Sequence, residues 1–345
     1  MYNHLDVPLE QWVKMDNFLV KYYYDTVINR LSIPLISNIR KDIVDADVIH
    51  IQMIFNLSSA MTILFACKMN KPVLLSPRGV MGKWIMENGI PLKKIWLKIF
   101  IKPFANLIHW HATSEQEALE IQSHYPHAKI HIIPNGIDIN KTDFEVYENR
   151  SGLYAQYISD KHKEIKGPVI VSMGRIHAKK GFDILINSFD LLMADYPEAL
   201  LFIVGQNEGE LSKLKALVAT LNLEKNIYFI TQLNGKAKLD FLANADVFAL
   251  SSHNENFGNV YLESLAVGTP VVASTKTPWK EVVEFSCGMW VKNSIEDFHL
   301  AMLNIIKHPE KYTKENCQRL ANKYSLKSVG ELFSVTFKKM FSEKA

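Results

Sequence analysis

Cysteine, glycine and long apolar runs are all scarce in this sequence of 345 residues. Its three cysteines, Cys67, Cys287 and Cys317, lie far apart and form no CxxC pair. This spacing excludes a disulfide framework and a cysteine-rich zinc site, and it fits a reducing compartment. No apolar run approaches the roughly 20 residues that span a bilayer, and residues 1–12 lack the layout of a signal peptide. We therefore expect a cytoplasmic location.

The net charge is also small, at +3, which is too little to indicate a nucleic-acid partner. Within residues 91–104, PLKKIWLKIFIKPF, lysines alternate with apolar and aromatic residues. A basic amphipathic helix of this kind can lie on an anionic membrane surface. A surface helix with its apolar face on the core would show the same pattern. The segment thus indicates either peripheral attachment to the cytoplasmic face of an inner membrane or an ordinary surface helix.

Short apolar runs alternate with segments of helical periodicity along most of the chain. The expected buried strands are 47–52, 72–77, 107–113 and 129–135 in the first half and 168–174, 199–205, 226–232, 246–252, 270–274 and 287–291 in the second. Helices are expected over 58–69, 114–122 and 182–193. Continuous apolar strands that alternate with helices predict parallel sheets covered on both faces. The length suits two such α/β domains, and both should be Rossmann-like.

A polar stretch without strong periodicity, residues 138–154, is expected to link the two halves. The predicted organisation is an N-terminal Rossmann-like domain over 1–150 and a C-terminal Rossmann-like domain over 151–325. Residues 326–345 should form a helix that crosses back to the first domain.

The start of the chain departs from the Rossmann pattern. The first credible strand is 47–52, and the aromatic segment 18–31 before it is typical of a helix. No glycine occurs before Gly79, so a strand, glycine-rich loop and helix that would open the first domain are expected to be missing.

The loop after the first strand of the second half reads GRIHAKKGFD, residues 174–183. Gly174 permits a tight exit from the strand. Arg175 and Lys180 follow at the carboxyl end of the strand, where open parallel sheets bind ligands. An arginine fork and a lysine point charge both suit a diphosphate. A solvated basic loop would contain the same residues, but the next loop favours the diphosphate site.

The loop and helix after the fourth strand of that half carry two acids, Glu255 and Glu263. Gly258 opens the expected helix, and the free amides of Gly258, Asn259 and Val260 at its N-terminus form an anion site. Glu263 lies part-way along this helix, where its carboxylate can accept hydrogen bonds from the vicinal hydroxyls of a sugar. The alternative for Glu263 is a solvated helix residue.

These residues, together with several further motifs, carry a resemblance to a known family. The E-x7-E pair of Glu255 and Glu263, the GR…K set of 174–180 and the motifs SPRG, HATSEQE, IIPNGID and ADVFALSSHNENFG occur in order along the chain. This set resembles the retaining glycosyltransferases of family 4, which have the GT-B fold. SPRG, HATSEQE and TPW resemble members that build bacterial lipopolysaccharide or capsule. The resemblance implies two Rossmann-like domains that face a cleft, with 1–150 on the acceptor side and 151–325 binding the nucleotide sugar. It also implies a UDP- or GDP-linked sugar donor and no metal or cofactor. Because the opening unit of the first domain is expected to be missing, we expect transfer to suffer more than nucleotide binding.

The resemblance also implies roles for individual residues. Arg175, Lys180 and Glu255 would be catalytic: the two cations would bind the donor diphosphate, and Glu255 would hold the transferred sugar. The residues expected to bind the donor are Glu263 on the ribose, together with Phe257, Gly258, Asn259, Val260, Gly205, Gln232 and Leu233. On the first-domain loop, Arg78 stands where many members have a histidine, so Arg78 and Gly79 are candidates for contact with the acceptor or the sugar.

The sequence thus predicts a retaining, metal-independent hexosyltransferase that acts on a growing, lipid-linked surface polysaccharide. Two alternatives remain. A nucleotide-sugar epimerase of the same fold would lack the E-x7-E pair, and a non-catalytic nucleotide-sugar-binding or scaffold protein would retain binding without transfer. His50, His109 and His111 lie in expected strands without metal-ligand spacing and are interpreted as structural.

Overall fold

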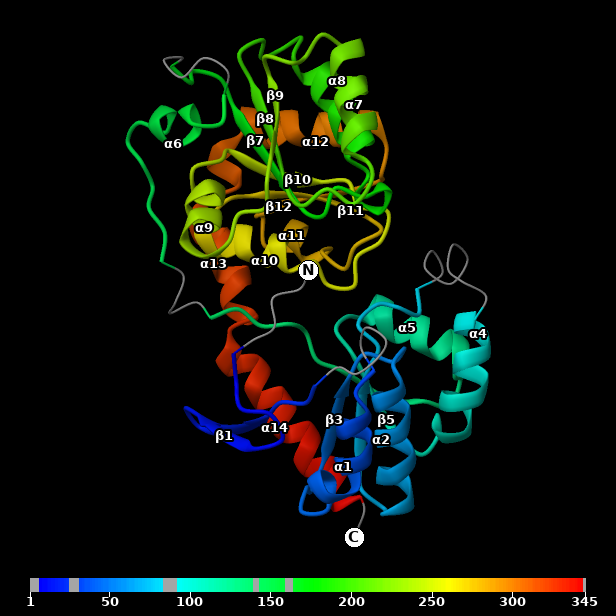
Figure 1. Ribbon diagram of the computed structural model, residues 1–345. Helices are drawn as coiled ribbons and strands as arrows, with labels where there is room; N and C mark the ends of the chain where they lie inside the picture. The colour runs from blue at the N-terminus through cyan, green and yellow to red at the C-terminus, as the bar shows by residue number, and fades with distance from the viewer. Residues whose placement is uncertain (1–5, 25–30, 83–91, 139–142, 159–163, 344–345) are drawn as a thin grey trace. The chain divides into compact units, whose positions relative to one another are not determined.

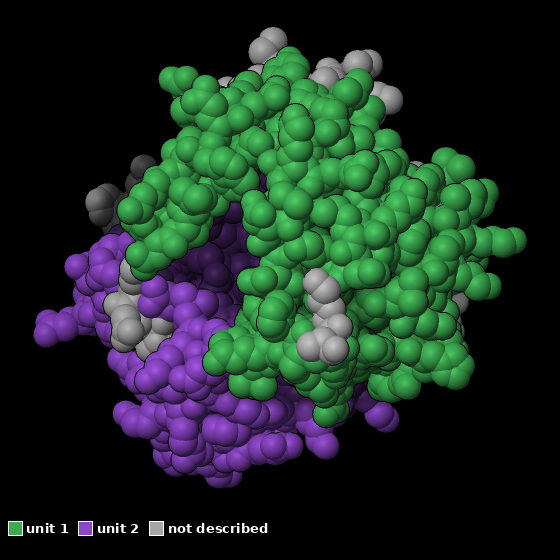
Figure 2. All heavy atoms as spheres, turned by 90° about the horizontal axis from the view of Figure 1, so that it is seen from below, with its two compact units in different colours: residues 1–133, 332–345 green, residues 134–331 purple. Residues whose placement is uncertain are grey.

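The computed structural model describes residues 6–24, 31–82, 92–138, 143–158 and 164–343. The chain divides into two compact units, which Figure 2 distinguishes by colour. Unit 1 comprises Met1–Ile133 and Leu332–Ala345, and unit 2 comprises Pro134–Glu331. Each unit is built around its own parallel sheet, so the expected α/β class with two Rossmann-like units is confirmed.

Unit 2 contains a six-stranded parallel sheet in the order β12-β11-β10-β7-β8-β9 (Figure 1). Its strands are β7 (Val169–Met173), β8 (Leu200–Val204), β9 (Ile227–Ile230), β10 (Val247–Leu250), β11 (Val271–Ser274) and β12 (Gly288–Val291). From β7 the chain proceeds through β8 to β9 and then returns to β10 on the other side of β7. This reversal creates a switch point between β7 and β10, and doubly wound sheets bind ligands at such a point.

The helices of unit 2 form two groups, because α7 contacts α8 and α12 whereas α10 contacts α9 and α13. They are α6 (Ser151–Ala155), α7 (Phe182–Leu192), α8 (Leu211–Thr220), α9 (Gly235–Ala243), α10 (Asn259–Val267), α11 (Glu281–Glu284), α12 (Ile295–Lys307) and α13 (Lys314–Lys323). Short 3-10 turns cover Ala178–Lys180 and Pro309–Lys311. Among the described residues, no helix combines the length and the apolar character needed to cross a membrane.

Unit 1 contains a four-stranded parallel sheet in the order β3-β4-β5-β6. Its strands are β3 (Ile49–Gln52), β4 (Val73–Ser76), β5 (His109–Ala112) and β6 (Lys129–Ile132), and its helices are α1 (Ile33–Ile43), α2 (Leu57–Lys68), α4 (Leu92–Trp96) and α5 (Glu115–His124). A π-helical turn, Leu97–Ile101, and a 3-10 turn, Lys102–Phe104, continue α4. All ten strands predicted in the two halves are therefore present, each within three residues of its expected ends.

The prediction of a helix over residues 18–31 is wrong for its first part. Phe18–Lys21 is strand β2, which pairs antiparallel with β1, Trp12–Met15. The two strands are joined at Asp16, whose φ is 49°, and aspartate tolerates this left-handed conformation in turns. Aromatic and β-branched residues on both sides of a tight turn favour a hairpin over a helix. Residues 25–30 of the expected helix lie outside the described residues.

The division between the units lies after Ile133, earlier than the boundary near residue 150 that the sequence pattern suggested. Backbone N–H groups of the segment before α6 donate hydrogen bonds to side chains at the end of α9, in unit 2. The N–H of Glu145 donates to Asp240 Oδ1 at 2.7 Å, and the N–H of Tyr147 donates to Asn244 Oδ1 at 2.8 Å. At the other end of the chain, α14 (Leu326–Ser342) contributes its residues from Leu332 onward to unit 1.

A chain of buried and half-buried polar side chains crosses the sheet of unit 1. His50 Nε2 lies 2.7 Å from Ser76 Oγ, and Ser76 Oγ lies 2.6 Å from His111 Nδ1. His111 Nε2 donates to the carbonyl of Ile133 at 2.7 Å. The ring of Phe333, from α14, contacts both His50 and His111. These two histidines therefore pack and hydrogen-bond within unit 1.

The histidines of unit 1 should make its stability sensitive to acid. Burial lowers the pKa of His50, His109 and His111 from 6.5 to about 4 in each case. Because the unfolded chain then binds more protons than the folded chain below pH 6.5, stability is full above that pH and falls toward pH 4. We expect the free energy of unfolding, measured by urea titration, to fall between about pH 7 and pH 5. Near pH 5 its slope against pH should correspond to the uptake of up to about three protons on unfolding.

Exchange of His50 and His111 for glutamine should reduce this pH dependence, whereas His127→Gln, at an exposed position, should leave it unchanged. Stability that is flat across this pH range would contradict the assignment of these histidines as neutral, buried groups.

Candidate active site

A pocket of about 600 Å³ lies at the carboxyl edge of the unit 2 sheet. Its walls come from the segments that follow β7, β8, β9 and β10 and from the first turns of α9 and α10. Every residue that the sequence predicts in the second half lines it: Arg175, Lys180, Gly205, Gln232, Leu233, Glu255, Phe257, Gly258, Asn259, Val260 and Glu263. The switch point of the sheet and the predicted residues thus coincide.

Two glycines bring the loops of this edge into backbone contact. A Cβ atom on Gly205 would lie 1.9 Å from the carbonyl oxygen of Gly174, and one on Gly181 would lie 2.1 Å from that of Ser251. Gly181 also has a φ of 63°, which favours glycine. Only glycine therefore allows the ends of β7, β8 and β10 to approach this closely.

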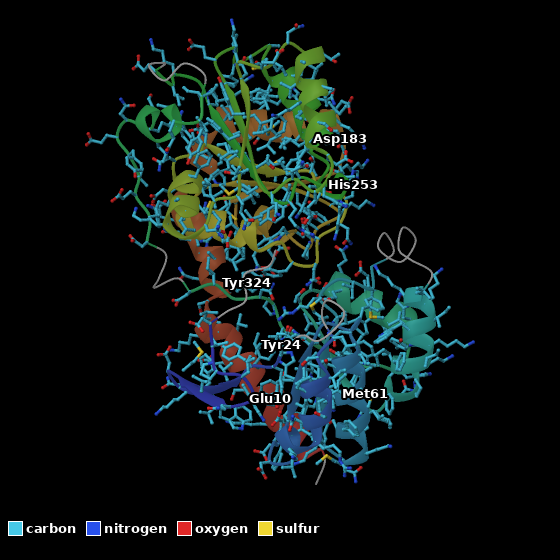
Figure 3. All side chains as sticks on the ribbon, in the orientation of Figure 1. Glu10, Tyr24, Met61, Asp183, His253 and Tyr324 are labelled. Carbon is cyan, nitrogen blue, oxygen red and sulfur yellow. The ribbon has the colours of Figure 1, made fainter. Side chains whose placement is uncertain are left out.

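Hydrogen bonds reinforce the approach of the loops after β7 and β10. The N–H of His253 donates to the carbonyl of Lys179 at 2.9 Å, and Ser251 Oγ donates to the carbonyl of Gly181. Figure 3 labels His253 and Asp183, which follow β10 and begin α7 respectively. The loop that carries Lys180 is therefore held against the loop that carries Glu255.

Lys180 and Glu255 form an ion pair inside the pocket. Their side chains are only 15% and 11% exposed, and Ser252 Oγ donates a second hydrogen bond to Glu255 Oε1 at 2.8 Å. Removal of one partner would leave a largely buried charge uncompensated, which is strongly unfavourable. The pair therefore fixes the position of both side chains in the absence of a ligand.

Arg175 is held differently, since its side chain is 66% exposed. Its Nη1 donates to both carboxylate oxygens of Glu208, at 2.9 and 3.1 Å. Backbone hydrogen bonds between Ile176 and Gln206, and between Glu208 and Ile176, join the two loops. An exposed ion pair of this kind contributes little stability, so an incoming anion can displace Glu208 from Arg175 easily.

Helix α10 presents its N-terminus to the pocket. Gly258, with a φ of 79°, precedes the helix, and Trp279 Nε1 donates to the carbonyl of Phe257 at 2.6 Å. Trp279 is fully buried and packs against Phe257 and Tyr261. The buried tryptophan thus holds the turn at Phe257 and Gly258 in place, and the N-terminus of α10 lies in the wall of the pocket.

Glu263 also has a partner that the sequence pattern did not reveal. Lys238, from α9, donates to Glu263 Oε1 at 2.6 Å, and both residues line the pocket. Asn135 likewise enters the pocket, where its amide donates to Asn259 Oδ1 at 2.8 Å. Lys238 belongs to no recognisable motif, whereas Asn135 stands in the IIPNGID motif, which is a sequence signal for a site residue.

The structure places Arg78 and Gly79 in unit 1, after β4. Arg78 Nε donates to Gln52 Oε1 at 2.6 Å, and the N–H of Gly79 donates to Glu117 Oε1 at 2.6 Å. Among the described residues, no three His, Cys, Asp or Glu side chains gather as metal ligands would. The metal-independent mechanism remains a prediction.

Two family models match the chain, one in each half. "Glycosyltransferase Family 4" matches residues 13–141, and "Glycosyl transferases group 1" matches residues 156–323. A mannosylfructose-phosphate synthase from Agrobacterium fabrum is 30% identical over 192 residues, which cover 53% of this chain and 41% of that protein. The lipopolysaccharide core biosynthesis glycosyltransferase LpsE of Rhizobium meliloti is 35% identical over 137 residues, 39% of this chain and 38% of LpsE. The matched part of the chain spans about half or less of such curated relatives.

A solved structure shows the same fold over most of the chain. The crystal structure of Anabaena Alr3699/HepE in complex with UDP has a TM-score of 0.73 and 19% identity, and the match covers 89% of this chain and 82% of that one. At this level of identity the likeness concerns the fold, and it confirms the predicted GT-B architecture.

Gly205→Ala should damage this site, because the new methyl group would collide with the carbonyl of Gly174. We expect a loss of about 2 kcal/mol or more in the free energy of unfolding, as for other overpacked positions, measured by urea titration. Gly152→Ala is the matched control, since a Cβ there meets no atom within 4 Å. Equal stability of the two variants would show that the close approach at Gly205 is unimportant.

Proposed function

Because the chain belongs to the family 4-like glycosyltransferases with the GT-B fold, we propose that it transfers a hexosyl sugar from a UDP- or GDP-linked donor. In this proposal the reaction retains the anomeric configuration, and the acceptor is a growing, lipid-linked surface polysaccharide. The observation that carries the proposal is the pocket at the switch point of unit 2. It combines two carboxylates, three cations and a helix N-terminus.

In the proposed mechanism, the leaving nucleoside diphosphate gains negative charge as its bond to the sugar breaks. Arg175, Lys180 and the N-terminal amides of α10 stabilise this charge, and preorganised groups of this kind act without a metal ion. The diphosphate displaces Glu208 as the partner of Arg175. It also binds Lys180, which keeps its contact with Glu255. Glu255 then accepts hydrogen bonds from the hydroxyls of the transferred sugar.

The remaining pocket residues hold the nucleoside. Glu263 accepts hydrogen bonds from the ribose hydroxyls, with its carboxylate held by Lys238. Gly205, Gln232 and Leu233 shape the space for the base. Arg78 and Gly79 contact the acceptor or the sugar from unit 1. The name of LpsE supports an acceptor in lipopolysaccharide assembly.

We also propose a cytoplasmic location with peripheral attachment to a membrane through residues 92–104. Leu97 and Ile101 of this segment are buried, whereas Leu92, Ile95 and Ile99 are more than half exposed. Lys94, Lys98 and Lys102 line a pocket of about 340 Å³ beside them. Exposed apolar side chains among lysines suit an anionic lipid surface better than water. Residue 91 of the expected segment lies outside the described residues.

Replacement of Arg175, Lys180 or Glu263 by alanine should weaken nucleoside diphosphate binding by about tenfold or more each, since each removes a charge-assisted contact. Isothermal titration calorimetry with UDP and GDP measures this directly. Lys213→Ala, at an exposed site on α8, should have no effect. Binding should persist in excess EDTA, and an absolute need for Mg²⁺ would refute the metal-independent mechanism.

Exchange of Lys94, Lys98 and Lys102 for glutamine should abolish binding to anionic liposomes, because each lysine near such a surface contributes about 1 kcal/mol. Co-sedimentation of the wild-type chain should also decline steeply as salt rises. A variant with Lys213, Lys215 and Lys225 exchanged, all exposed in unit 2, controls for net charge. Equal and poor sedimentation with neutral and anionic liposomes would show that the segment is only a surface helix.

A further inference from the structure

Arg78 follows β4 in an unusual backbone conformation. Its φ is 61°, and that of Gly79 is 73°, so two successive residues are left-handed. Glycine adopts this conformation without strain, but a side chain with a Cβ does not. Strained residues of this kind cluster at binding and catalytic sites, where the surrounding structure holds them in place. A glycine would satisfy the turn at position 78, so the presence of arginine points to a role for its guanidinium.

Glu117 holds the loop in this conformation. Its side chain is buried, with 2% of the residue exposed. One carboxylate oxygen accepts from the N–H of Gly79 at 2.6 Å, and the other accepts from the N–H and the hydroxyl of Thr113 at 2.7 and 2.9 Å. Glu117 therefore ties the loop after β4 to the end of β5. Such charge-assisted hydrogen bonds are among the strongest available to a buried carboxylate.

Gln52 orients the guanidinium itself. Its Oε1 accepts from Arg78 Nε at 2.6 Å, and its Nε2 lies 3.0 Å from His50 Nε2. His50 continues into the buried chain through Ser76 and His111. The contact with His50 holds the amide nitrogen of Gln52, so its amide oxygen has a fixed position. The hydrogen bond from Arg78 Nε to this oxygen then sets the plane of the guanidinium.

Burial lowers the pKa of the Arg78 guanidinium below its usual value, and the nearby carboxylate of Glu117 offsets part of this effect. Gln52, Arg78 and Thr113 all stand at the carboxyl ends of β3, β4 and β5, the edge at which parallel sheets bind ligands. An arginine with a fixed plane at such an edge is suited to bidentate binding of an oxyanion.

We propose that Arg78 binds a phosphate group of the acceptor, and that Gln52 and Glu117 are positioning residues for it. This inference rests on the proposed function, because it concerns the second substrate of the transfer reaction. Arg175 and Lys180 in unit 2 already provide cations for the donor diphosphate, so we assign Arg78 to an anionic group of the second substrate. The acceptor is then a phosphorylated compound, either a soluble phosphate ester or a lipid phosphate.

The test measures phosphate binding to the full chain after the donor pocket has been saturated with UDP or GDP. Glycerol 3-phosphate is the soluble probe, with glycerol as its control, and vesicles with phosphatidic acid are the lipid probe, with phosphatidylcholine vesicles as theirs. Arg78→Gln should lower the affinity for at least one phosphate probe about tenfold and leave the Kd for the nucleoside diphosphate unchanged. Arg175→Ala should do the reverse. Arg40→Gln, exposed on α1, removes the same charge from unit 1 and should have no effect.

Gln52→Ala and Glu117→Gln should each weaken phosphate binding several-fold without a change in nucleotide affinity, and Arg78→Lys should restore part of the affinity lost in Arg78→Gln. If Glu117→Gln lowers the melting temperature sharply, its loss of phosphate binding reflects a loss of stability. The phosphate affinity of Gln52→Ala then tests the positioning role. Equal binding of both phosphate probes by the wild type and Arg78→Gln would overturn the inference, as would a wild-type chain that binds neither. Failure of UDP and GDP to bind would refute the proposed function instead, and the same phosphate titrations on the nucleotide-free chain would still test Arg78.

Discussion

The close approach of Gly205 to Gly174 is the constraint on which the donor pocket depends. With a Cβ at Gly205 only 1.9 Å from the carbonyl of Gly174, no other residue allows β7 and β8 to end so near each other. Gly181 has the same effect toward Ser251, across the switch point of the sheet. Because the chemistry-bearing side chains stand on these loops, the backbone contacts bring them to one edge of the sheet. The ion pair of Lys180 with Glu255 then fixes two of them within the pocket.

Within that frame, each cation of the pocket already has a carboxylate partner, but the pairs differ in strength. Lys180 and Glu255 are largely shielded from water, so their interaction is strong and their separation would be unfavourable. Arg175 and Glu208 are exposed, and water screens them. A diphosphate can therefore separate Arg175 from Glu208 readily, whereas the separation of Lys180 from Glu255 is unfavourable. We infer that Arg175 makes the first contact with the donor, and that Lys180 acts only when the phosphate lies close enough to share it with Glu255.

The sequence was most informative where spacing follows from the fold. All ten strands of the two sheets could be predicted, since buried parallel strands are continuous apolar runs, and the residues after β7 and β10 had to meet at one edge. Partners that depend on side-chain direction could not be predicted: Lys238 reaches Glu263 from another helix, and nothing in the spacing of α9 distinguishes it from a surface lysine. The hairpin of residues 12–21 was missed for another reason. A tight turn at Asp16 outweighed an aromatic pattern that a helix also tolerates.

Arg78 and Arg175 illustrate two ways in which a fold can present the same side chain. Arg175 stands on a loop in a weak ion pair, so it can follow a ligand whose charge changes during the reaction. Arg78 is held by a strained backbone, by Gln52 and, through Gly79, by Glu117, so little freedom is lost when it binds. Preorganisation of this kind increases affinity because the ordering has occurred during folding. It suits a group that must be placed in one position before transfer, and a phosphate remote from the reacting hydroxyl is such a group.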